Sequence, residues 1–270
     1  MIKINDNEFN EIVSYVRNNY GVNLEKKRPL IEGRLGLHLY TLGYDNFKDY
    51  FEFAKKDPTK QEMGTMIARL TTNHTYFMRE EQHFKYFNNT ILRWIDEDLK
   101  EKDLRIWSAG CSSGPEPYTL SMVILDHYET VPARPNTVVL ASDISGKVLS
   151  EGRKGIYKAA QLEELPERWL KKYFVSIGDD QWQVNDKLRK NVAYKKINLL
   201  DNFDVKKPFH VIFCRNVMIY FDNPTKEELV QKFFDAMIPG GFLIIGHSES
   251  LSVLKQNFDY LRPSIYRKPF

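Results

Sequence analysis

The apolar run Leu104-Arg105-Ile106-Trp107 leads directly into Ser108-Ala109-Gly110-Cys111-Ser112-Ser113-Gly114-Pro115-Glu116-Pro117-Tyr118, and a helical pattern follows. The run is too short for a helix and favours a β-strand. In the strand-loop-helix unit that results, small loop residues let the backbone approach a ligand, and the start of the helix directs amide groups toward it. The alternative is a glycine-rich turn that serves only packing.

Three further short apolar runs, at residues 137–140, 210–213 and 242–245, are separated by helical patterns. One of these helices is expected over residues 225–237, ended by Pro239-Gly240-Gly241. Alternation of strand and helix predicts a doubly wound α/β domain over residues 101–270, with a mostly parallel sheet. In such a domain, ligands bind beyond the carboxyl ends of the strands.

Other parts of the chain have different periodicities. Residues 1–70 read as short amphipathic helices with no strand signal, which predicts an all-helical domain. Residues 71–100 form a connector that is partly helical, and its apolar residues are spaced for one buried face. Residues 170–196 fit neither period and predict a small β subdomain, with a hairpin that turns at Gly178-Asp179-Asp180.

Composition excludes several classes of protein. The 270 residues carry a net charge of +3, too small to indicate a nucleic-acid partner or a membrane surface. Only two cysteines occur, Cys111 and Cys214, so neither a disulfide framework nor a cysteine-rich zinc site is expected, and we predict no metal. The sequence lacks an apolar secretory signal and any run long enough to span a membrane, and a reducing cytoplasm fits best.

The loop after the first strand matches neither common phosphate-binding motif. Gly-Lys-Ser/Thr and Gly-x-Gly-x-x-Gly are both absent, and Glu116 would repel a pyrophosphate. A carboxylate here suits a ligand with positive charge or hydroxyl donors. Asp143 ends the second strand, 29 residues beyond Gly114, where an acid can accept hydrogen bonds from ribose hydroxyls. Asp143 could instead simply cap the next helix.

Five more polar positions are candidates, and three of them have an ordinary alternative. Arg215 and Asn216 follow the third strand and place hydrogen-bonding groups at the cleft. Tyr220 lies close behind them, although a buried tyrosine is more often a core aromatic. Asn198 could bond an adenine edge or be a turn residue. Arg79, in the polar run of residues 70–80, could clamp a carboxylate or be a solvated charge.

Six blocks of sequence, in this order along the chain, together resemble the bacterial chemotaxis receptor methyltransferases of the CheR type. The blocks are Thr72-Asn73-His74-Thr75-Tyr76-Phe77-Met78-Arg79-Glu80, Gly110-Cys111-Ser112-Ser113-Gly114-Pro115-Glu116-Pro117-Tyr118, Ala141-Ser142-Asp143-Ile144, Asn198-Leu199-Leu200, Phe213-Cys214-Arg215-Asn216-Val217-Met218-Ile219-Tyr220-Phe221-Asp222 and Gly246-His247-Ser248-Glu249.

The resemblance implies a Rossmann-like methyltransferase domain that uses S-adenosylmethionine to methylate glutamate side chains on cytoplasmic helices of chemoreceptors. The products would be glutamate methyl esters and S-adenosylhomocysteine. Arg79 and Tyr220 are the positions that the family places beside the methyl transfer. The positions that the resemblance assigns to the cofactor site are Asn73, Thr75, Arg79, Glu116, Asp143, Asn198, Leu199, Arg215 and Asn216.

The resemblance also implies a receptor contact through residues 1–70. Lys27, Arg34 and His38 share one helix face, with Arg28 adjacent, and could meet an acidic receptor surface. Family members that bind a C-terminal receptor peptide use a glycine-rich loop; this chain has only Gly178 there, so such tethering is not predicted. Three other hypotheses are a methyltransferase for a small carboxylate or another protein, a dinucleotide oxidoreductase, and a non-catalytic binding module.

Overall fold

The computed structural model describes residues 2–71, 74–99, 103–129 and 135–270. Its N-terminal unit contains the helices α1 (Asp6–Tyr20), α2 (Arg28–Thr41), α3 (Phe47–Lys56) and α4 (Gln61–Leu70). Helix α1 begins with a capping box between Asn5 and Glu8, and it ends at Gly21, whose φ of 72° is left-handed. The four helices enclose their own apolar core, in agreement with the predicted all-helical unit.

The main sheet has the strand order β6-β2-β1-β7-β8-β10-β9. Strands β6, β2, β1, β7 and β8 are parallel, whereas β10 and β9 are antiparallel additions. The strands are β1 (Asp103–Ala109), β2 (Asn136–Asp143), β6 (Val192–Lys196), β7 (Phe209–Cys214), β8 (Met237–Ile245), β9 (Asp259–Arg262) and β10 (Ile265–Arg267). All four predicted strands lie within β1, β2, β7 and β8, and the mostly parallel sheet is confirmed.

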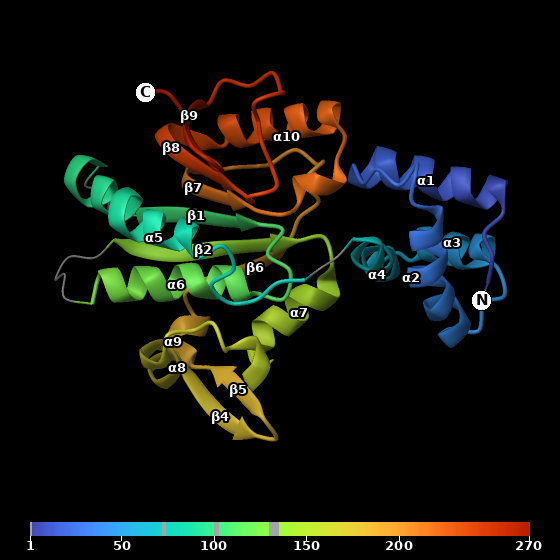
Figure 1. The fold of residues 1–270 in the computed structure, drawn as a ribbon, viewed down its shortest axis with the longest axis horizontal. Helices are drawn as coiled ribbons and strands as arrows, with labels where there is room; N and C mark the ends of the chain where they lie inside the picture. The colour runs from blue at the N-terminus through green and yellow to red at the C-terminus, as the bar shows by residue number, and fades with distance from the viewer. Residues whose placement is uncertain (1, 72–73, 100–102, 130–134) are drawn as a thin grey trace.

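Helices cover both faces of this sheet (Figure 1). Side chains alternate between the faces along each strand: in β1, Ile106 packs into one apolar cluster and Trp107 into the other. One face is covered by α6 (Pro115–His127) and the other by α10 (Asn223–Asp235). The connector adds α5 (Gln82–Tyr86) and the π-helical turns η1 (Phe87–Leu92) and η2 (Ile95–Leu99) to the α6 side.

The apolar residues of the connector are buried as the sequence predicts. These are Phe84, Phe87, Ile91, Trp94 and Ile95.

A second, three-stranded sheet stands apart from the main one, with the order β3-β5-β4 (Figure 1). The predicted hairpin is present as β4 (Phe174–Gly178) and β5 (Gln181–Val184), and positive φ at Asp179 and Asp180 forms its turn. The range 170–196 predicted for the small β subdomain differs from the observed small sheet at both ends. Strand β3 (Ile156–Lys158) also belongs to the small sheet, whereas β6 pairs with β2 in the main sheet.

The remaining short elements are α7 (Gly146–Lys154), η3 (Ala159–Gln161), α8 (Glu167–Tyr173), α9 (Asp186–Arg189) and η4 (Met218–Tyr220). The segment Pro239-Gly240-Gly241 does not follow α10 as a turn, as the sequence suggested, but lies inside β8. Gly240 has a φ of 76°, and a Cβ there would lie 2.7 Å from the Phe270 ring. Tight packing therefore explains this glycine.

The helical unit is bonded to the α/β domain at several points. Val22 forms a β-bridge with Phe221, and the amide of Asn23 donates to the Tyr220 carbonyl oxygen at 2.8 Å. Helix α4 approaches the start of α7 closely, because a Cβ on Gly64 would lie 3.2 Å from the Ile144 carbonyl oxygen. These contacts place the helical unit against the carboxyl edge of the main sheet.

Within the described residues, none of the helices combines the length and the apolar character that crossing a bilayer requires.

A buried histidine predicts how stability depends on pH. His210 in β7 accepts a hydrogen bond from the Arg105 amide at Nδ1, and burial, aided by the Arg105 charge, lowers its pKa to about 4. As pH falls below about 6.5, the His210 ring takes up a proton in the unfolded chain but stays neutral in the folded chain, so the free energy of unfolding decreases. Between pH 7.0 and 5.5 this loss is about 1 kcal/mol for His210.

Urea unfolding of the wild type and of His210→Asn at both pH values measures this loss. The variant keeps an acceptor for Arg105 but does not titrate, so its free energy of unfolding should fall by about 1 kcal/mol less than that of the wild type. Each protein is compared with its own value at pH 7.0, which removes the effect of the smaller side chain. Equal declines in both proteins would contradict the prediction.

Candidate active site

The carboxyl ends of β1, β2, β6 and β7 meet around a cavity, here called the inner cavity, of about 1020 Å³ counted out to its open mouth. This edge includes the point between β1 and β7 where the strand order reverses, the usual ligand position in such sheets. The cavity brings together nine of the ten predicted site residues: Thr75, Arg79, Glu116, Asp143, Asn198, Leu199, Arg215, Asn216 and Tyr220. The tenth, Asn73, lies outside the described residues.

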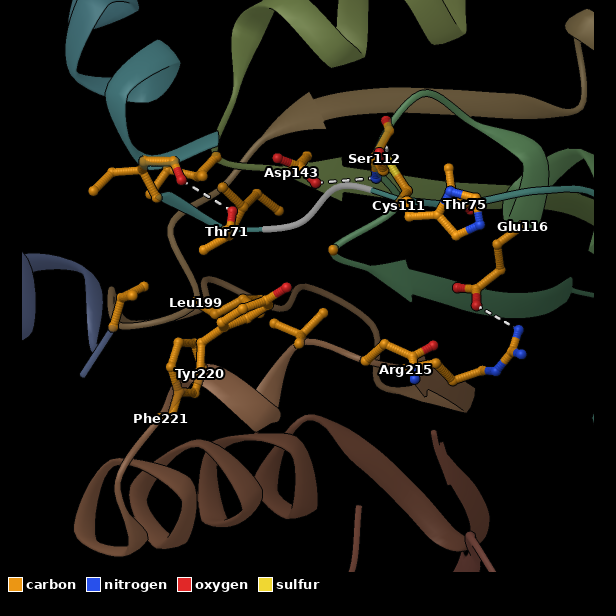
Figure 2. Close-up of a pocket in the computed structure, with 18 of the residues that line it drawn as sticks. Thr71, Thr75, Cys111, Ser112, Glu116, Asp143, Leu199, Arg215, Tyr220 and Phe221 are labelled. Carbon is orange, nitrogen blue, oxygen red and sulfur yellow. Dashed lines mark hydrogen bonds and ion pairs between the residues drawn. The ribbon is translucent and has the colours of Figure 1, made fainter. Parts of the chain in front are cut away.

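Asp143 ends β2 at the wall of the inner cavity. Its Oδ2 accepts from the Ser112 amide at 3.0 Å (Figure 2). Its Oδ1 accepts from the Ser145 amide at 2.9 Å. Burial raises the pKa of Asp143 even though these amide bonds oppose the change. The helix-capping alternative does not hold, because the side chain of Ser145 caps α7. Asp143 keeps lone pairs that can accept from a ligand hydroxyl.

The loop between β1 and α6 is shaped by contacts within the protein. A Cβ on Gly110 would lie 2.3 Å from Val217, and a Cβ on Gly114 would lie 2.4 Å from the Tyr194 hydroxyl oxygen. Both glycines also have positive φ. The packing explanation therefore accounts for these two glycines, while the backbone of Gly110, Cys111 and Ser112 still lines the inner cavity.

Arg215 forms a buried ionic triad with two carboxylates, and its side chain is only 2% exposed. Nη1 lies 2.9 Å from Glu116 Oε2, and Nη2 lies 3.1 Å from Glu80 Oε2. Burial alone would raise the pKa of Glu80, but Arg215 holds it below its usual value. Glu116 also accepts from the Ser108 hydroxyl at 2.6 Å. Because one guanidinium is shared by two carboxylates, the triad keeps a net negative charge, and the role of Glu116 toward a ligand with positive charge or hydroxyl donors stays a prediction.

Arg79 lies beside this triad on the connector. Its Nη1 donates to the His74 carbonyl oxygen at 2.7 Å, and its own carbonyl oxygen accepts from Arg215 Nη2. The residues on either side, Met78 and Glu80, have φ values of 61° and 56°. Left-handed backbone at two non-glycine residues costs energy and is characteristic of functional sites.

Three predicted residues come from the loops after β6 and β7. Asn216 has a φ of 60°, and its Nδ2 lies 3.4 Å from Glu80 Oε1. Leu199 provides an apolar wall (Figure 2). Asn198 donates to the Asn19 carbonyl oxygen at 2.9 Å and accepts from the Leu200 amide. Both ends of this amide thus bond the protein, although the oxygen keeps a second lone pair, and the bond to adenine stays a prediction.

A second hollow, here called the outer cavity, adjoins the first on the side of the helical unit. The residues that line both cavities are His74, Arg79, Asn216 and Tyr220. The outer cavity is also lined by Lys27 and Arg34 of the helical unit. Arg79 and Tyr220 therefore lie where the two cavities adjoin.

The predicted basic face of α2 is only partly present. Arg34 donates to the carbonyl oxygens of Arg69 and Leu70 at the end of α4, beside the outer cavity. Arg28 turns away and pairs with Asp6. His38 bonds Glu62 at 2.8 Å with its side chain 10% exposed, because α4 packs on this face. Lys27 is exposed, so Lys27 and Arg34 are the members of the face that reach the outer cavity.

Glu80, His83 and His247 place possible metal-ligating atoms within 4.8 Å of one another. Glu80 Oε2 already accepts from the Arg215 guanidinium and from the His247 amide. The rings of His83 and His247 are in edge contact, with centroids 4.6 Å apart. Burial, with the Arg215 charge, lowers the pKa of His83 to about 3, so this ring is neutral. We assign the cluster a packing role.

Sequence reasoning missed the part of the inner cavity that comes from the helical unit. Tyr20, Val22 and Ile67 line the cavity, yet their spacing indicates only ordinary helix core. It also gave no role to Glu80, although this residue lies next to Arg79 in the polar run. Local sequence patterns cannot signal a contact between residues 80 and 215.

Comparison with known proteins identifies the family of the chain. The chain matches the family model described as "CheR methyltransferase, SAM binding domain" over residues 73–266, and "CheR methyltransferase, all-alpha domain" over residues 7–71. It is 42% identical to the chemotaxis protein methyltransferase of Borreliella burgdorferi, covering 99% of this chain and 96% of that protein. It is 34% identical to the chemotaxis protein methyltransferase of Escherichia coli, and the match covers 98% of this chain and 92% of that protein. The chain therefore belongs to the CheR methyltransferase family, whose members use S-adenosylmethionine.

Proposed function

We propose that this chain methylates glutamate side chains of chemoreceptors and thereby contributes to sensory adaptation. The observation that carries the proposal is the pair of adjoining cavities, which share Arg79 and Tyr220. The inner cavity would hold S-adenosylmethionine, and the outer cavity would admit the acceptor carboxylate. The names of the relatives support a chemotaxis protein as the substrate.

The inner cavity fits this cofactor in chemistry as well as in position. We assign the ribose hydroxyls to Asp143, whose carboxylate is held by the Ser112 and Ser145 amides. Apolar side chains such as Ile67 and Leu199 suit the adenine ring. We extend the assignment to Asn73, Thr75, Glu116, Asn198, Arg215 and Asn216, with Glu116 and Arg215 acting through their ion pair. When bound, S-adenosylmethionine supplies an electrophilic methyl group on a sulfonium.

Alignment is the main task of the protein in this reaction. A glutamate with a reference pKa of about 4.3 is already ionised at neutral pH, so no general base is needed. Arg79, oriented by its bond to His74, would direct a carboxylate by bidentate hydrogen bonding, and the Tyr220 hydroxyl would complete its orientation. Arg79 should position the carboxylate without fully neutralising it, because a very strong ion pair would stabilise the ground state.

Receptor recognition is assigned to residues 1–70, and residues 71–100 are assigned to the connector that completes the cofactor site. Lys27 and Arg34 flank the outer cavity and would attract the acidic surface around a receptor glutamate. The two cysteines are buried and unpaired, which supports work in the reducing cytoplasm.

The reaction can be tested with tritiated S-adenosylmethionine and membranes that contain the receptors. We expect alkali-labile label in the receptor band, released as volatile methanol. Arg79→Ala should lower this rate about 100-fold or more, because the acceptor loses its alignment. Arg93→Ala, an exposed arginine on the same connector, is the matched control and should keep the wild-type rate. Wild-type activity in folded Arg79→Ala would remove Arg79 from the site.

Calorimetry with S-adenosylhomocysteine tests the ribose assignment. Asp143→Ala should weaken binding by about 1.5 to 3 kcal/mol, or about 10- to 150-fold, the loss of charge-assisted hydrogen bonds. Asp235→Ala, at an exposed position of α10, serves as the control. Unchanged affinity in Asp143→Ala would refute the assignment, and tight binding of NAD alone would refute the methyltransferase proposal itself.

Charge reversal at Lys27 tests the receptor surface. Lys27→Glu should raise the KM for receptor membranes about 3- to 10-fold, more at low salt than at high salt, and leave the affinity for S-adenosylhomocysteine unchanged. Lys187→Glu changes the same charge on exposed α9 and should have no effect. An equal effect of both reversals would show that only total charge matters.

A further inference from the structure

The segment Gly246-His247-Ser248-Glu249 follows β8, and its glutamate has no role in the function proposed above. Strands β7 and β8 are parallel neighbours, with Cys214 opposite Ile245 at their ends. The segments that follow them are therefore side by side at the carboxyl edge of the sheet. The segment after β7 carries Asn216 and Tyr220.

The Glu249 carboxylate is bonded to the backbone of both segments. Its Oε2 accepts from the Gly246 amide at 2.6 Å and from the Asn216 amide at 2.9 Å. Its Oε1 accepts from the Ile219 amide at 3.2 Å. One side chain thus fixes the turn from Asn216 to Ile219 to the end of β8.

This turn has an unfavourable conformation that needs such support. Asn216 has a φ of 60°, and the next residues form the short helix η4 (Met218–Tyr220). Asn216 and Tyr220 line both cavities, whereas Glu249 lines neither of them as the described residues form them. Glu249 instead borders a small separate pocket with Met218 and Ile219, behind the turn.

We propose that Glu249 is a positioning residue for methyl transfer, which holds the backbone of the Asn216–Tyr220 turn so that the Tyr220 hydroxyl reaches the junction of the two cavities. The inference rests on the role proposed for Tyr220. Glu249 itself would touch neither cofactor nor acceptor.

A carboxylate suits this position better than any other side chain. Both of its oxygens accept from backbone amides. A glutamine would replace one oxygen by an NH2 group, which cannot accept, so a backbone N–H would lose its partner. Burial raises the pKa of Glu249, and the amide bonds from Gly246, Asn216, Met218 and Ile219 oppose this change. Gly246 is part of the same arrangement, because a Cβ there would lie 2.6 Å from Asn216 Nδ2 and 2.9 Å from Glu249 Oε2.

The test is steady-state methylation of receptor membranes by Glu249→Gln, together with calorimetry using S-adenosylhomocysteine. We expect kcat to fall at least about tenfold and the affinity for S-adenosylhomocysteine to fall by a clearly smaller factor, because Asn216 moves with the turn whereas Asp143 and Ser112 are untouched. Glu227→Gln is the matched control: Glu227 also accepts from a backbone amide, that of Lys255 at 3.0 Å, and should keep the wild-type kcat.

Gly246→Ala disturbs the same turn without changing the carboxylate. It provides the test of the positioning role if Glu249→Gln does not fold. It should lower kcat similarly, and the double variant should lose less than the product of the two effects, since both disturb one unit. Wild-type kcat in either folded variant, or an equal loss in Glu227→Gln, overturns the inference. Tyr220→Phe separates this inference from the proposed function. A wild-type kcat in Tyr220→Phe would refute the role proposed for Tyr220. A lowered kcat in Tyr220→Phe together with a wild-type kcat in Glu249→Gln would refute only the positioning role of Glu249.

Discussion

The site depends on Arg215, whose guanidinium is buried between Glu80 and Glu116. These three residues come from the connector, the end of β7 and the start of α6, so one side chain joins three distant parts of the chain. A charge buried to this extent is tolerated only when it is paired, and removing Arg215 would leave two neighbouring carboxylates without their counter-ion. The triad therefore ties the geometry of the cavity to the folding of the α/β domain.

The same triad supports the strained backbone around Arg79. Left-handed conformations at Met78 and Glu80 would not persist in a free connector, but Arg215 bonds both the Glu80 carboxylate and the Arg79 carbonyl oxygen. Next to the triad, Glu249 supports left-handed Asn216 in a similar way. Buried carboxylates and an arginine thus offset the local backbone cost at both left-handed segments.

Local patterns predicted the central strands and the helical unit well, because strand and helix periodicities are properties of neighbouring residues. Pairing between distant segments was less predictable. Residues 192–196 looked like part of the small sheet but pair with β2, and β3 is too short to give a signal. Site residues at strand ends could be named, yet the ion pair of Glu116 and the internal bonds of Asn198 depend on Arg215 and Asn19, far away in sequence.

The closure of the inner cavity by Tyr20, Val22 and Ile67 limits how freely this enzyme can be rearranged. A recognition unit attached by a plain linker could be exchanged for another without cost to the reaction centre. Here the unit supplies part of the cavity wall and bonds the backbone of Tyr220 through Asn23. Under the receptor-recognition role proposed for this unit, changes that adapt the helices to a new receptor must preserve these inner side chains, and variation in specificity would be confined to the outer surface of the unit.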